Sequence, residues 1–264
     1  MRLKDKTVLI TGASKGIGKA LAIGMAKEGA DIIINYNSDK KGAEDTKAAV
    51  EALGRKAWIE QCDISSTDSI FAMYKRIQTY TKQIDVLVNN AAITGWGKVF
   101  ELTPEKWDYV INTNLRGTFF CSVEAARMMK EHGGGSIINI STNCAELGVK
   151  NLVAYSSSKG GVHAMTKQLA IELAQYKIRV NTFAPGPTNV ERNLSDDPEY
   201  RTSWGSMVPM KRTADAEEMV GPAVFLACED SSYMTGQVFF VDGGWTVQGK
   251  IPEANAEMAA NKNK

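Results

Sequence analysis

The chain has 264 residues, with 31 Lys and Arg against 30 Asp and Glu, and 44% of its residues are hydrophobic. A folded chain of this length buries roughly 70–75% of the surface that its unfolded form exposes, so disorder is excluded and no disulfide or metal is needed for a stable core. The formal net charge of +1 gives no general attraction to nucleic acid or to an anionic membrane. Any charged ligand must therefore be held by a local site.

The cysteines and the start of the chain indicate the cellular setting. Cys62, Cys121, Cys144 and Cys228 are scattered, without a Cys-x-x-Cys pair or a nearby histidine. This argues against zinc and disulfides and favours reduced thiols. The apolar run before Thr11 is too short for a signal-peptide core or a membrane span. We therefore expect a cytoplasmic protein without a metal site and without a membrane or nucleic-acid partner.

Short runs rich in Val, Ile and Phe alternate with longer stretches of helical periodicity. The predicted strands are Thr7–Thr11, Asp31–Tyr36, Lys56–Gln61, Asp85–Asn89, Ser136–Ser141, Ile178–Phe183 and Gln237–Val241. The predicted helices are Gly16–Glu28, Asp39–Leu53, Thr67–Thr81, Pro104–Glu131, Ala154–Gln175 and Asp215–Ala227. This alternation predicts a single-domain, Rossmann-like α/β fold, with a doubly wound parallel sheet of about seven strands and helices on both faces.

Two segments interrupt the alternation. Residues 186–213 are polar and long, and residues 250–264 form a tail rich in Ala, Asn and Lys. Long insertions in compact domains are usually functional, and ligands of open α/β sheets bind beyond the carboxyl ends of the strands, where the first segment would emerge. We expect a dinucleotide-binding and catalytic domain at residues 1–249, with a substrate lid at about 186–213, followed by a C-terminal extension at 250–264.

The first predicted strand is followed by Thr11-Gly12-Ala13-Ser14-Lys15-Gly16-Ile17-Gly18 and then by a helical pattern. Glycines allow a tight turn and a close approach to a pyrophosphate, and the free N–H groups of the following helix attract its charge. A plain tight turn is the alternative for three glycines alone. A P-loop does not fit, because the spacing from Gly12 is one residue too long and Ala20 replaces the magnesium-binding Ser or Thr.

Further motifs follow this G-x-x-x-G-x-G turn in order. They are Asn89-Asn90-Ala91-Ala92, Asn114, Tyr155-x-x-x-Lys159 and Pro185-Gly186. The ordered set resembles the short-chain dehydrogenase/reductase family over about residues 4–249, and within it the chain looks similar to bacterial glucose or sugar 1-dehydrogenases and to 3-oxoacyl-ACP reductases. The resemblance implies hydride transfer between a nicotinamide cofactor and a secondary alcohol or carbonyl compound.

Tyr155 and Lys159 lie four residues apart at the start of a predicted helix, on one helix face. A phenol with a pKa near ~10 is a poor base at neutral pH, and an adjacent ammonium stabilises its phenolate. The resemblance implies that Tyr155 transfers the proton, and that Lys159 lowers the pKa of the phenol and binds the nicotinamide ribose. Taken alone, the pair would more often belong to an exposed polar helix face.

The family places a serine thirteen residues before the tyrosine, to bond the reacting oxygen, and Thr142 stands there. A threonine hydroxyl can donate the same bond, although its methyl group narrows the pocket. Because successive strand side chains point to opposite faces, we expect Thr142 to reach the site and keep Ser141 as the reserve. Asn114 matches the residue that positions a water connected to the lysine; local hydrogen bonding in a bent helix is the alternative.

The resemblance also implies the cofactor-binding positions. They are Gly12, Ser14, Lys15, Gly16, Ile17, Gly18, Tyr36, Asn37, Asp63, Ile64, Asn90, Ala91, Tyr155, Lys159, Pro185, Gly186 and Thr188. Asp63 matches the acceptor of the adenine amino group, with an ordinary carboxylate at the start of a helix as the alternative. Thr188 would replace the hydroxyl that the family usually has at Val190.

The end of the second strand decides the expected cofactor. NAD-preferring enzymes keep a carboxylate there for the ribose 2′-hydroxyl, whereas this chain has Tyr36. Lys15 is a cation that the family places near a 2′-phosphate, so NADP(H) is favoured. Asn37 stands where many NADP enzymes have arginine, which leaves NAD(H) as the alternative.

Several polar and apolar side chains match no family site. We expect His132 and His163 to be structural. Trp204, Met207 and Met210 either line a substrate pocket or hold the long polar segment against the domain.

The expected protein is an NAD(P)(H)-dependent oxidoreductase acting on CH–OH groups, with a sugar or another polyol as substrate. Asn143-Cys144-Ala145-Glu146 departs from the sugar-dehydrogenase pattern, and a 3-oxoacyl-thioester reductase is the alternative enzyme. A non-catalytic NADP-sensing protein is the alternative of another class, because a fold alone does not fix function. The resemblance also implies a homotetramer that packs through the two long helices at 104–131 and 154–175.

Overall fold

The computed structural model describes residues 1–249, and its centre is a parallel sheet with the strand order β3-β2-β1-β4-β5-β6-β9. The strands are β1 (Thr7–Ile10), β2 (Asp31–Tyr36), β3 (Ala57–Gln61), β4 (Val86–Asn89), β5 (Gly135–Ile140), β6 (Ile178–Pro185) and β9 (Val238–Val241). The chain builds one half of the sheet outward from β1 and then starts again beside β1 with β4. The prediction of a doubly wound α/β sheet of seven strands is confirmed.

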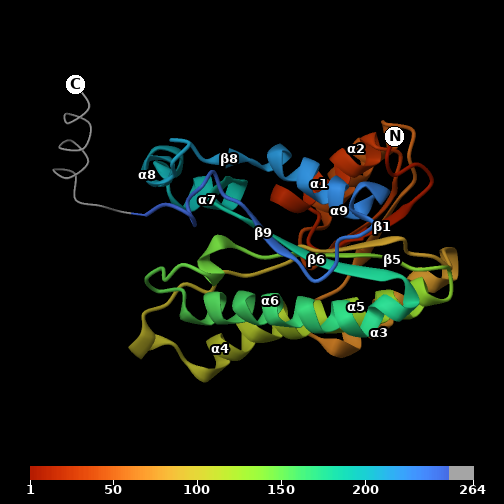
Figure 1. The fold of residues 1–264 in the computed structure, drawn as a ribbon, viewed down its shortest axis with the longest axis horizontal. Helices are drawn as coiled ribbons and strands as arrows, with labels where there is room; N and C mark the ends of the chain where they lie inside the picture. Colours follow the sequence, from red (N-terminus) through yellow and green to blue (C-terminus); the bar gives the residue numbers. More distant parts are fainter. Residues whose placement is uncertain (250–264) are drawn as a thin grey trace.

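Helices cover both faces of the sheet. In Figure 1, α1, α2 and α9 lie on one face, and α3, α5 and α6 lie on the other. The helices of the domain are α1 (Gly16–Lys27), α2 (Lys40–Glu51), α3 (Thr67–Tyr80), α4 (Pro104–Ile111), α5 (Gly117–Lys130), α6 (Val153–Leu173) and α9 (Val220–Ala227). Shorter helical turns are η1 (Val99–Glu101), η3 (Asn143–Ala145), η4 (Ala174–Tyr176), η5 (Ala216–Met219) and η6 (Glu229–Ser231).

Strand side chains enter two separate apolar cores. Val8 and Ile10 of β1 are fully buried against the α1 side, while Leu9 between them is fully buried against the α3 side. The same alternation holds for β2, with Ile33 facing the second core. Successive side chains of a strand point to opposite faces, so a strand covered on both sides must be apolar at every position. This is why the strands appear in the sequence as unbroken apolar runs.

The segment predicted as one helix at 104–131 is divided in the structure. A π-helical turn, η2 (Asn112–Arg116), separates α4 from α5, so the prediction of an uninterrupted α-helix is wrong. A Cβ at Gly117 would lie 2.2 Å from the Ile64 carbonyl oxygen, which shows how closely the backbone passes the loop after β3. The widened turn accommodates this contact, and π-turns of this kind are frequent at functional sites.

The long polar segment is folded rather than irregular. It contains β7 (Thr188–Asn189), α7 (Glu191–Asp196) and α8 (Tyr200–Met207), and β7 pairs with β8 (Ala214–Asp215). Figure 1 shows α7 and α8 together at one end of the domain. The predicted C-terminal extension at 250–264 lies outside the described residues. Among the helices of residues 1–249, none combines the length and hydrophobicity that crossing a bilayer requires.

Candidate active site

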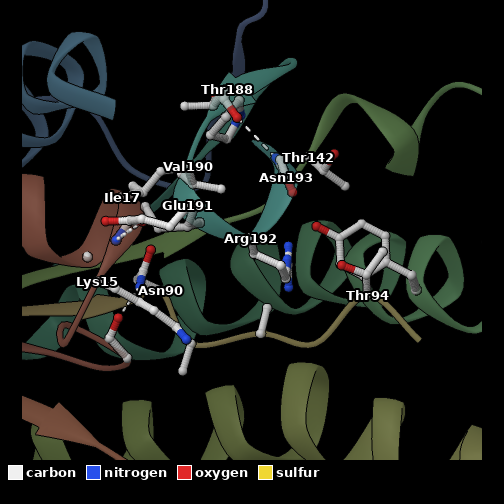
Figure 2. Close-up of a pocket in the computed structure, with 18 of the residues that line it drawn as sticks. Lys15, Ile17, Asn90, Thr94, Thr142, Thr188, Val190, Glu191, Arg192 and Asn193 are labelled. Atoms are coloured by element: carbon white, nitrogen blue, oxygen red, sulfur yellow. Dashed lines mark hydrogen bonds between the residues drawn. The ribbon is translucent and has the colours of Figure 1, made fainter. Parts of the chain in front are cut away.

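The loops that follow the carboxyl ends of the strands enclose one large cavity. It has a volume of about 430 Å³, and it extends past the glycine turn, the end of β2, the start of α6 and the segment with α7 and α8. Pockets of roughly 300–1,000 Å³ hold small ligands, and open α/β sheets bind them at this edge. Figure 2 shows Lys15, Ile17 and Asn90 in one part of this cavity and Thr94 and Thr142 in another.

The glycine turn presents backbone donors to the cavity. Gly12 and Gly16 have φ angles of +64° and +56°, the left-handed region that favours glycine. A Cβ at Gly18 would lie 2.3 Å from the Gly12 carbonyl oxygen, so only glycine lets α1 approach the turn this closely. The Gly16 N–H donates to Glu191 Oε2 at 3.1 Å. The carboxylate oxygen at the start of α1 shows that these N–H groups can donate to an anionic oxygen. This fits the pyrophosphate of a dinucleotide.

The end of β2 forms another wall. Tyr36 and Asn37 border the cavity as predicted, and so do Ser38 and Asp39, which the sequence analysis missed. The side chain of Asp39 also accepts from the Gly42 N–H at 3.0 Å and begins α2. The position of Ser38 and Asp39 just after the end of β2 was the sequence signal that could have identified them. This carboxylate weakens the argument for strict NADP preference that rested on Tyr36.

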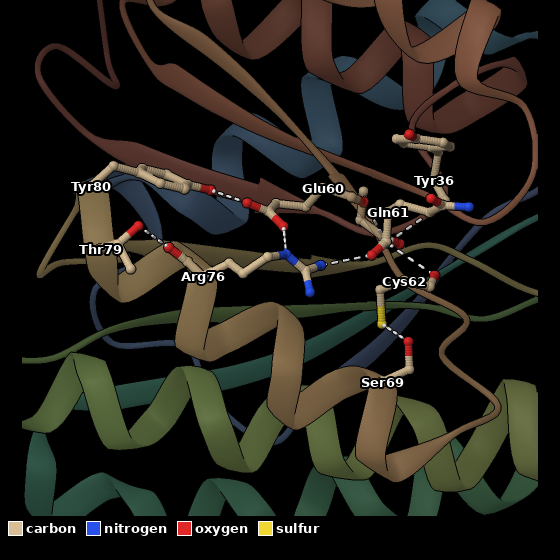
Figure 3. A network of polar contacts seen from close by, with 9 residues as sticks. Tyr36, Glu60, Gln61, Cys62, Ser69, Arg76, Thr79 and Tyr80 are labelled. Atoms are coloured by element: carbon tan, nitrogen blue, oxygen red, sulfur yellow. Dashed lines mark hydrogen bonds and ion pairs between the residues drawn. The ribbon is translucent and has the colours of Figure 1, made fainter.

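A polar network supports this wall from the outer strand (Figure 3). The buried carboxylate of Glu60 accepts from Arg76 Nε at 2.9 Å and from the Tyr80 hydroxyl at 3.0 Å. Arg76 also donates to the Gln61 carbonyl at 2.7 Å, and the Gln61 side chain donates to the Asn37 carbonyl at 3.1 Å. Helix α3 therefore holds the ends of β2 and β3 in place.

Asp63 and Ile64, predicted to contact the cofactor, do not border the cavity. Asp63 Oδ1 accepts from the Ser65 N–H at 2.9 Å, and Ile64 is buried in the core on the α3 side. Asp63 lies in the turn before α3, whose N-cap is Ser66, so the helix-start role considered for Asp63 is not the one present in the structure. A cofactor contact for either residue stays a prediction.

The first turns of α6 place Tyr155 and Lys159 on the cavity. Lys159 is 2% exposed, and its ammonium donates to the Ile140 carbonyl oxygen at 2.7 Å. Burial lowers the pKa of Lys159 to about 8. Burial raises the pKa of Tyr155 to about 12, and the Arg192 guanidinium and the Thr142 hydroxyl oppose that rise. The Arg192 guanidinium is thus a cation that acts on Tyr155 and that the sequence analysis did not consider, and the same effect of Lys159 stays a prediction.

Thr142 and Ser141 at the end of β5 use their hydroxyls differently. Ser141 Oγ bonds His163 Nε2 at 2.7 Å, and His163 Nδ1 bonds Glu146 Oε1 at 3.2 Å. The Thr142 hydroxyl accepts from the Cys144 N–H at 3.2 Å and donates to Asn143 Oδ1 at 3.4 Å. Thr142 lines the cavity together with Tyr155, while the hydroxyl of Ser141 is committed to a buried histidine.

The comparisons with known proteins agree with this geometry. A family described as "Enoyl-(Acyl carrier protein) reductase" matches residues 12–246. Glucose 1-dehydrogenase 2 of Bacillus subtilis is 38% identical over 248 residues, which is 93% of this chain and 96% of that protein. The chain belongs to the short-chain dehydrogenase/reductase family. It is therefore an oxidoreductase of a family that acts on CH–OH groups and uses NAD(P).

Two further similarities bear on this short-chain dehydrogenase/reductase. A 3-oxoacyl-[acyl-carrier-protein] reductase of Staphylococcus aureus is 35% identical over 241 residues, 90% of this chain and 97% of that protein. A solved structure from Beutenbergia cavernae, provisionally described as an NAD(P) dependent gluconate 5-dehydrogenase with bound NADP, has a TM-score of 0.87 and 33% identity. That similarity covers 93% of this chain and 98% of the other.

Asn114 of this dehydrogenase/reductase is fully buried in the π-helical turn and does not border the cavity. Its Oδ1 accepts from the Ile93 N–H at 2.9 Å, and its Nδ2 donates to the Ile93 carbonyl at 2.9 Å and to Ser158 Oγ at 3.1 Å. Local hydrogen bonding in a distorted helix, the alternative considered for this residue, is what the structure contains. The role in positioning a water stays a prediction.

The segment after β6 closes the remaining side of the cavity. Pro185, Gly186 and Thr188 border it as predicted, with the Thr188 hydroxyl donating to the Gly186 carbonyl at 3.0 Å. Trp204 also borders the cavity and packs edge-to-face on Trp245, with ring centroids 5.8 Å apart. Met207 and Met210, considered beside Trp204, are 48% and 61% exposed and lie outside this cavity.

The lining also includes residues that the sequence analysis assigned to no site, among them Trp96, Leu152, Arg192 and Trp245. None belongs to a motif, and they come from separate loops and helices that only the fold brings together. No cluster of three or more His, Cys, Asp or Glu side chains suited to a metal ion occurs within residues 1–249.

Proposed function

We propose that this protein interconverts a hydroxylated small molecule and its carbonyl form, with Tyr155 as the proton-transferring group. One observation carries the proposal: Tyr155 and Lys159 from α6 and Thr142 from the turn after β5 meet in the cavity that the glycine turn also borders. A nucleotide-sensing protein has no need of a phenol, a buried ammonium and a hydroxyl beside the same space. This convergence favours catalysis over the sensing alternative.

Each side chain has a distinct part in the proposed reaction. When bound, the nicotinamide supplies or accepts the hydride. The Thr142 hydroxyl donates a hydrogen bond to the reacting oxygen, and the Tyr155 hydroxyl gives that oxygen its proton during reduction or takes it during oxidation. The ammonium of Lys159 binds ribose hydroxyls and, with its pKa near 8, exchanges protons close to neutral pH. The three groups need no metal ion for these steps.

NADP(H) is the proposed cofactor, and NAD(H) the proposed second choice. Lys15 borders the cavity at the start of α1 and offers a cation to a 2′-phosphate. Asp39 borders it too and offers an acceptor to a free ribose hydroxyl, which supports use of NAD(H) as well. The similar structure from Beutenbergia cavernae holds NADP.

We also propose that residues 186–213 act as the substrate lid of a cytoplasmic homotetramer. The segment provides one wall of the cavity through α7 and α8, which suits a lid. The four cysteines are free and buried, as in a reducing compartment. Exposed apolar side chains on the two helical stretches predicted to pack, Phe119 of α5 and Ile171 of α6, offer apolar surface for a subunit contact.

The proposed substrate is a sugar or a related polyol, and a 3-oxoacyl thioester is the second candidate because of the Staphylococcus aureus relative. The test is to mix the protein with NADPH or NADP⁺, and separately with NADH or NAD⁺, and to follow nicotinamide absorbance. Glucose, glucitol, gluconate and acetoacetyl-CoA represent the candidate classes. Turnover of a hydroxylated compound is expected. Tight cofactor binding without turnover of any member of a broad alcohol and ketone panel would favour the sensor.

A further inference from the structure

Arg192 places a guanidinium in the cavity beside the proposed catalytic groups. It is the second residue of α7 and borders the cavity together with Tyr155 and Thr142. Figure 2 shows its side chain extending into the space that also faces Thr94 and Thr142. Its positive charge acts on Tyr155 and on Tyr200, which both line this part of the cavity.

This guanidinium has no acidic partner in the part of the chain that the structure describes. The nearby arginines differ: Arg212 pairs with Glu218 at 2.6 Å, and Arg201 lies 3.9 Å from Asp215. Arg192 forms neither an ion pair nor a hydrogen bond with any of residues 1–249, and it faces a ligand cavity. A guanidinium presents donors in a planar fork that matches the two oxygens of a carboxylate.

The cofactor's pyrophosphate is the obvious rival ligand, and the neighbouring residue separates the two sites. Glu191 turns toward the glycine turn, where it accepts from the Gly16 N–H. Successive side chains of a helix diverge by about 100°, so Arg192 is directed elsewhere. In Figure 2, Glu191 lies toward Ile17, and the end of Arg192 lies toward Thr94. The guanidinium therefore faces the part of the cavity that holds Tyr155.

We propose that Arg192 binds a carboxylate of the substrate, so that the enzyme acts on a hydroxy acid or oxo acid such as a sugar acid. This inference rests on the proposed function and names the substrate class of that same site. A phosphate group could use the same donors, but it usually takes more than one cation or a helix start. Lys159 donates to the Ile140 carbonyl and is assigned to the ribose of the cofactor, and α7 has only six residues, so neither supplies the second contact. The carboxylate is therefore the ligand to which we commit.

The test compares molecules that share a carbon chain and differ in one group. Gluconate, glucitol 6-phosphate and glucitol carry a carboxylate, a phosphate and a neutral group, and 3-hydroxybutanoate with 1,3-butanediol is a shorter pair. Arg192→Gln is expected to lower kcat/KM for the preferred acid by about 100-fold, mainly through KM, and for its neutral counterpart by less than about 3-fold. Arg192→Lys should retain part of the preference. Arg2→Gln, which removes an exposed arginine outside the cavity and outside the proposed lid, should leave both values unchanged.

The ratio of kcat/KM for the acid to kcat/KM for its neutral counterpart isolates the proposed contact between Arg192 and the carboxylate. Arg192 also acts on Tyr155, and any effect through that phenol changes both members of a pair equally and leaves their ratio unchanged. An equal loss for both members, a preference for the phosphate, or a neutral preference in both pairs would overturn the proposal. So would loss of NADPH affinity in Arg192→Gln by fluorescence titration, with the acid-to-neutral ratio retained. A failure of the proposed function differs, since no pair would then be turned over.

Binding supplies a readout that does not need turnover. Titration of the wild-type NADPH complex with gluconate and 3-hydroxybutanoate, followed by NADPH fluorescence, should show saturable binding of at least one acid. Arg192→Gln should weaken that binding by about 100-fold. Absence of binding by both acids would refute the carboxylate site.

Discussion

Replacing Lys159 with methionine is expected to stabilise the folded protein while abolishing turnover. The side chain is 2% exposed, and its only hydrogen bond within residues 1–249 goes to the Ile140 carbonyl at 2.7 Å. Burial lowers the pKa of Lys159 from 10.5 to about 8, so the charged form is less stable in the folded protein than in the unfolded chain. Methionine has a similar length and no charge to desolvate.

The size of the effect follows from the pKa. The pKa of Lys159 is lowered by roughly 2.5, which corresponds to about 3.5 kcal/mol at about 1.4 kcal/mol for each pH unit. Losing the bond to the Ile140 carbonyl costs about 1 kcal/mol. Methionine should therefore raise the free energy of unfolding by about 2.5 kcal/mol at pH 7.

The pH dependence has a definite sign. Below pH 8, Lys159 is charged in both the folded and the unfolded protein, so the full destabilisation is present. Between pH 8 and 10.5 the folded protein loses the proton while the unfolded chain keeps it, so the stability of the wild type rises with pH. Above pH 10.5 the lysine is neutral in both states, and the advantage of methionine disappears.

Denaturant unfolding at pH 7 and at pH 9.5 measures the stabilisation by methionine and its dependence on pH. Both measurements are made without cofactor and at one fixed protein concentration. Lys167→Met removes an exposed lysine from the same helix and should change the unfolding free energy by less than about 0.5 kcal/mol at either pH. Destabilisation by Lys159→Met at pH 7, or the same difference at both pH values, would refute the assignment of a desolvated ammonium.

Five further substitutions test three features of the site. Thr142→Val should lower kcat by about 100-fold with NADPH affinity retained. The kcat values of Thr142→Ser and Ser141→Ala should stay within about 5-fold of the wild type. A larger loss of kcat in Ser141→Ala than in Thr142→Val would assign the reacting hydroxyl to Ser141 instead. Asp39→Asn should raise the NADP⁺ to NAD⁺ ratio of kcat/KM by about 10-fold, and an unchanged ratio would place this carboxylate away from the ribose. Glu191→Ala should tighten NADPH binding by about 3–10-fold in a fluorescence titration, because its carboxylate no longer occupies the Gly16 N–H; weaker binding would contradict this.

Local sequence signals predicted most of the sheet. The predicted strand Asp31–Tyr36 has the same bounds as β2, because its apolar run is buried on both faces and ends at turn residues. The break in the helix at 104–131 could not be predicted in this way. It depends on the contact of Gly117 with Ile64 and on the bonds of Asn114 to Ile93, which join segments distant in sequence.

The site was predictable where its residues form a motif. The glycine turn and the Tyr155-x-x-x-Lys159 spacing are local, and the structure brings both to one cavity. The direction of the Lys159 ammonium depends on the Ile140 carbonyl of β5, which the helix pattern does not encode. Arg192 belongs to no motif, and only the packing of α7 across the strand ends places it beside Tyr155.

The central claim is that Tyr155 transfers the proton in a cavity that holds the nicotinamide. Turnover and NADPH affinity of Tyr155→Phe, measured with a substrate of the wild type, test it most directly. The substitution removes only the phenolic hydroxyl. We predict NADPH affinity within about 3-fold of the wild type and a fall in kcat of about 10²–10⁴-fold. Wild-type turnover in Tyr155→Phe would contradict the account.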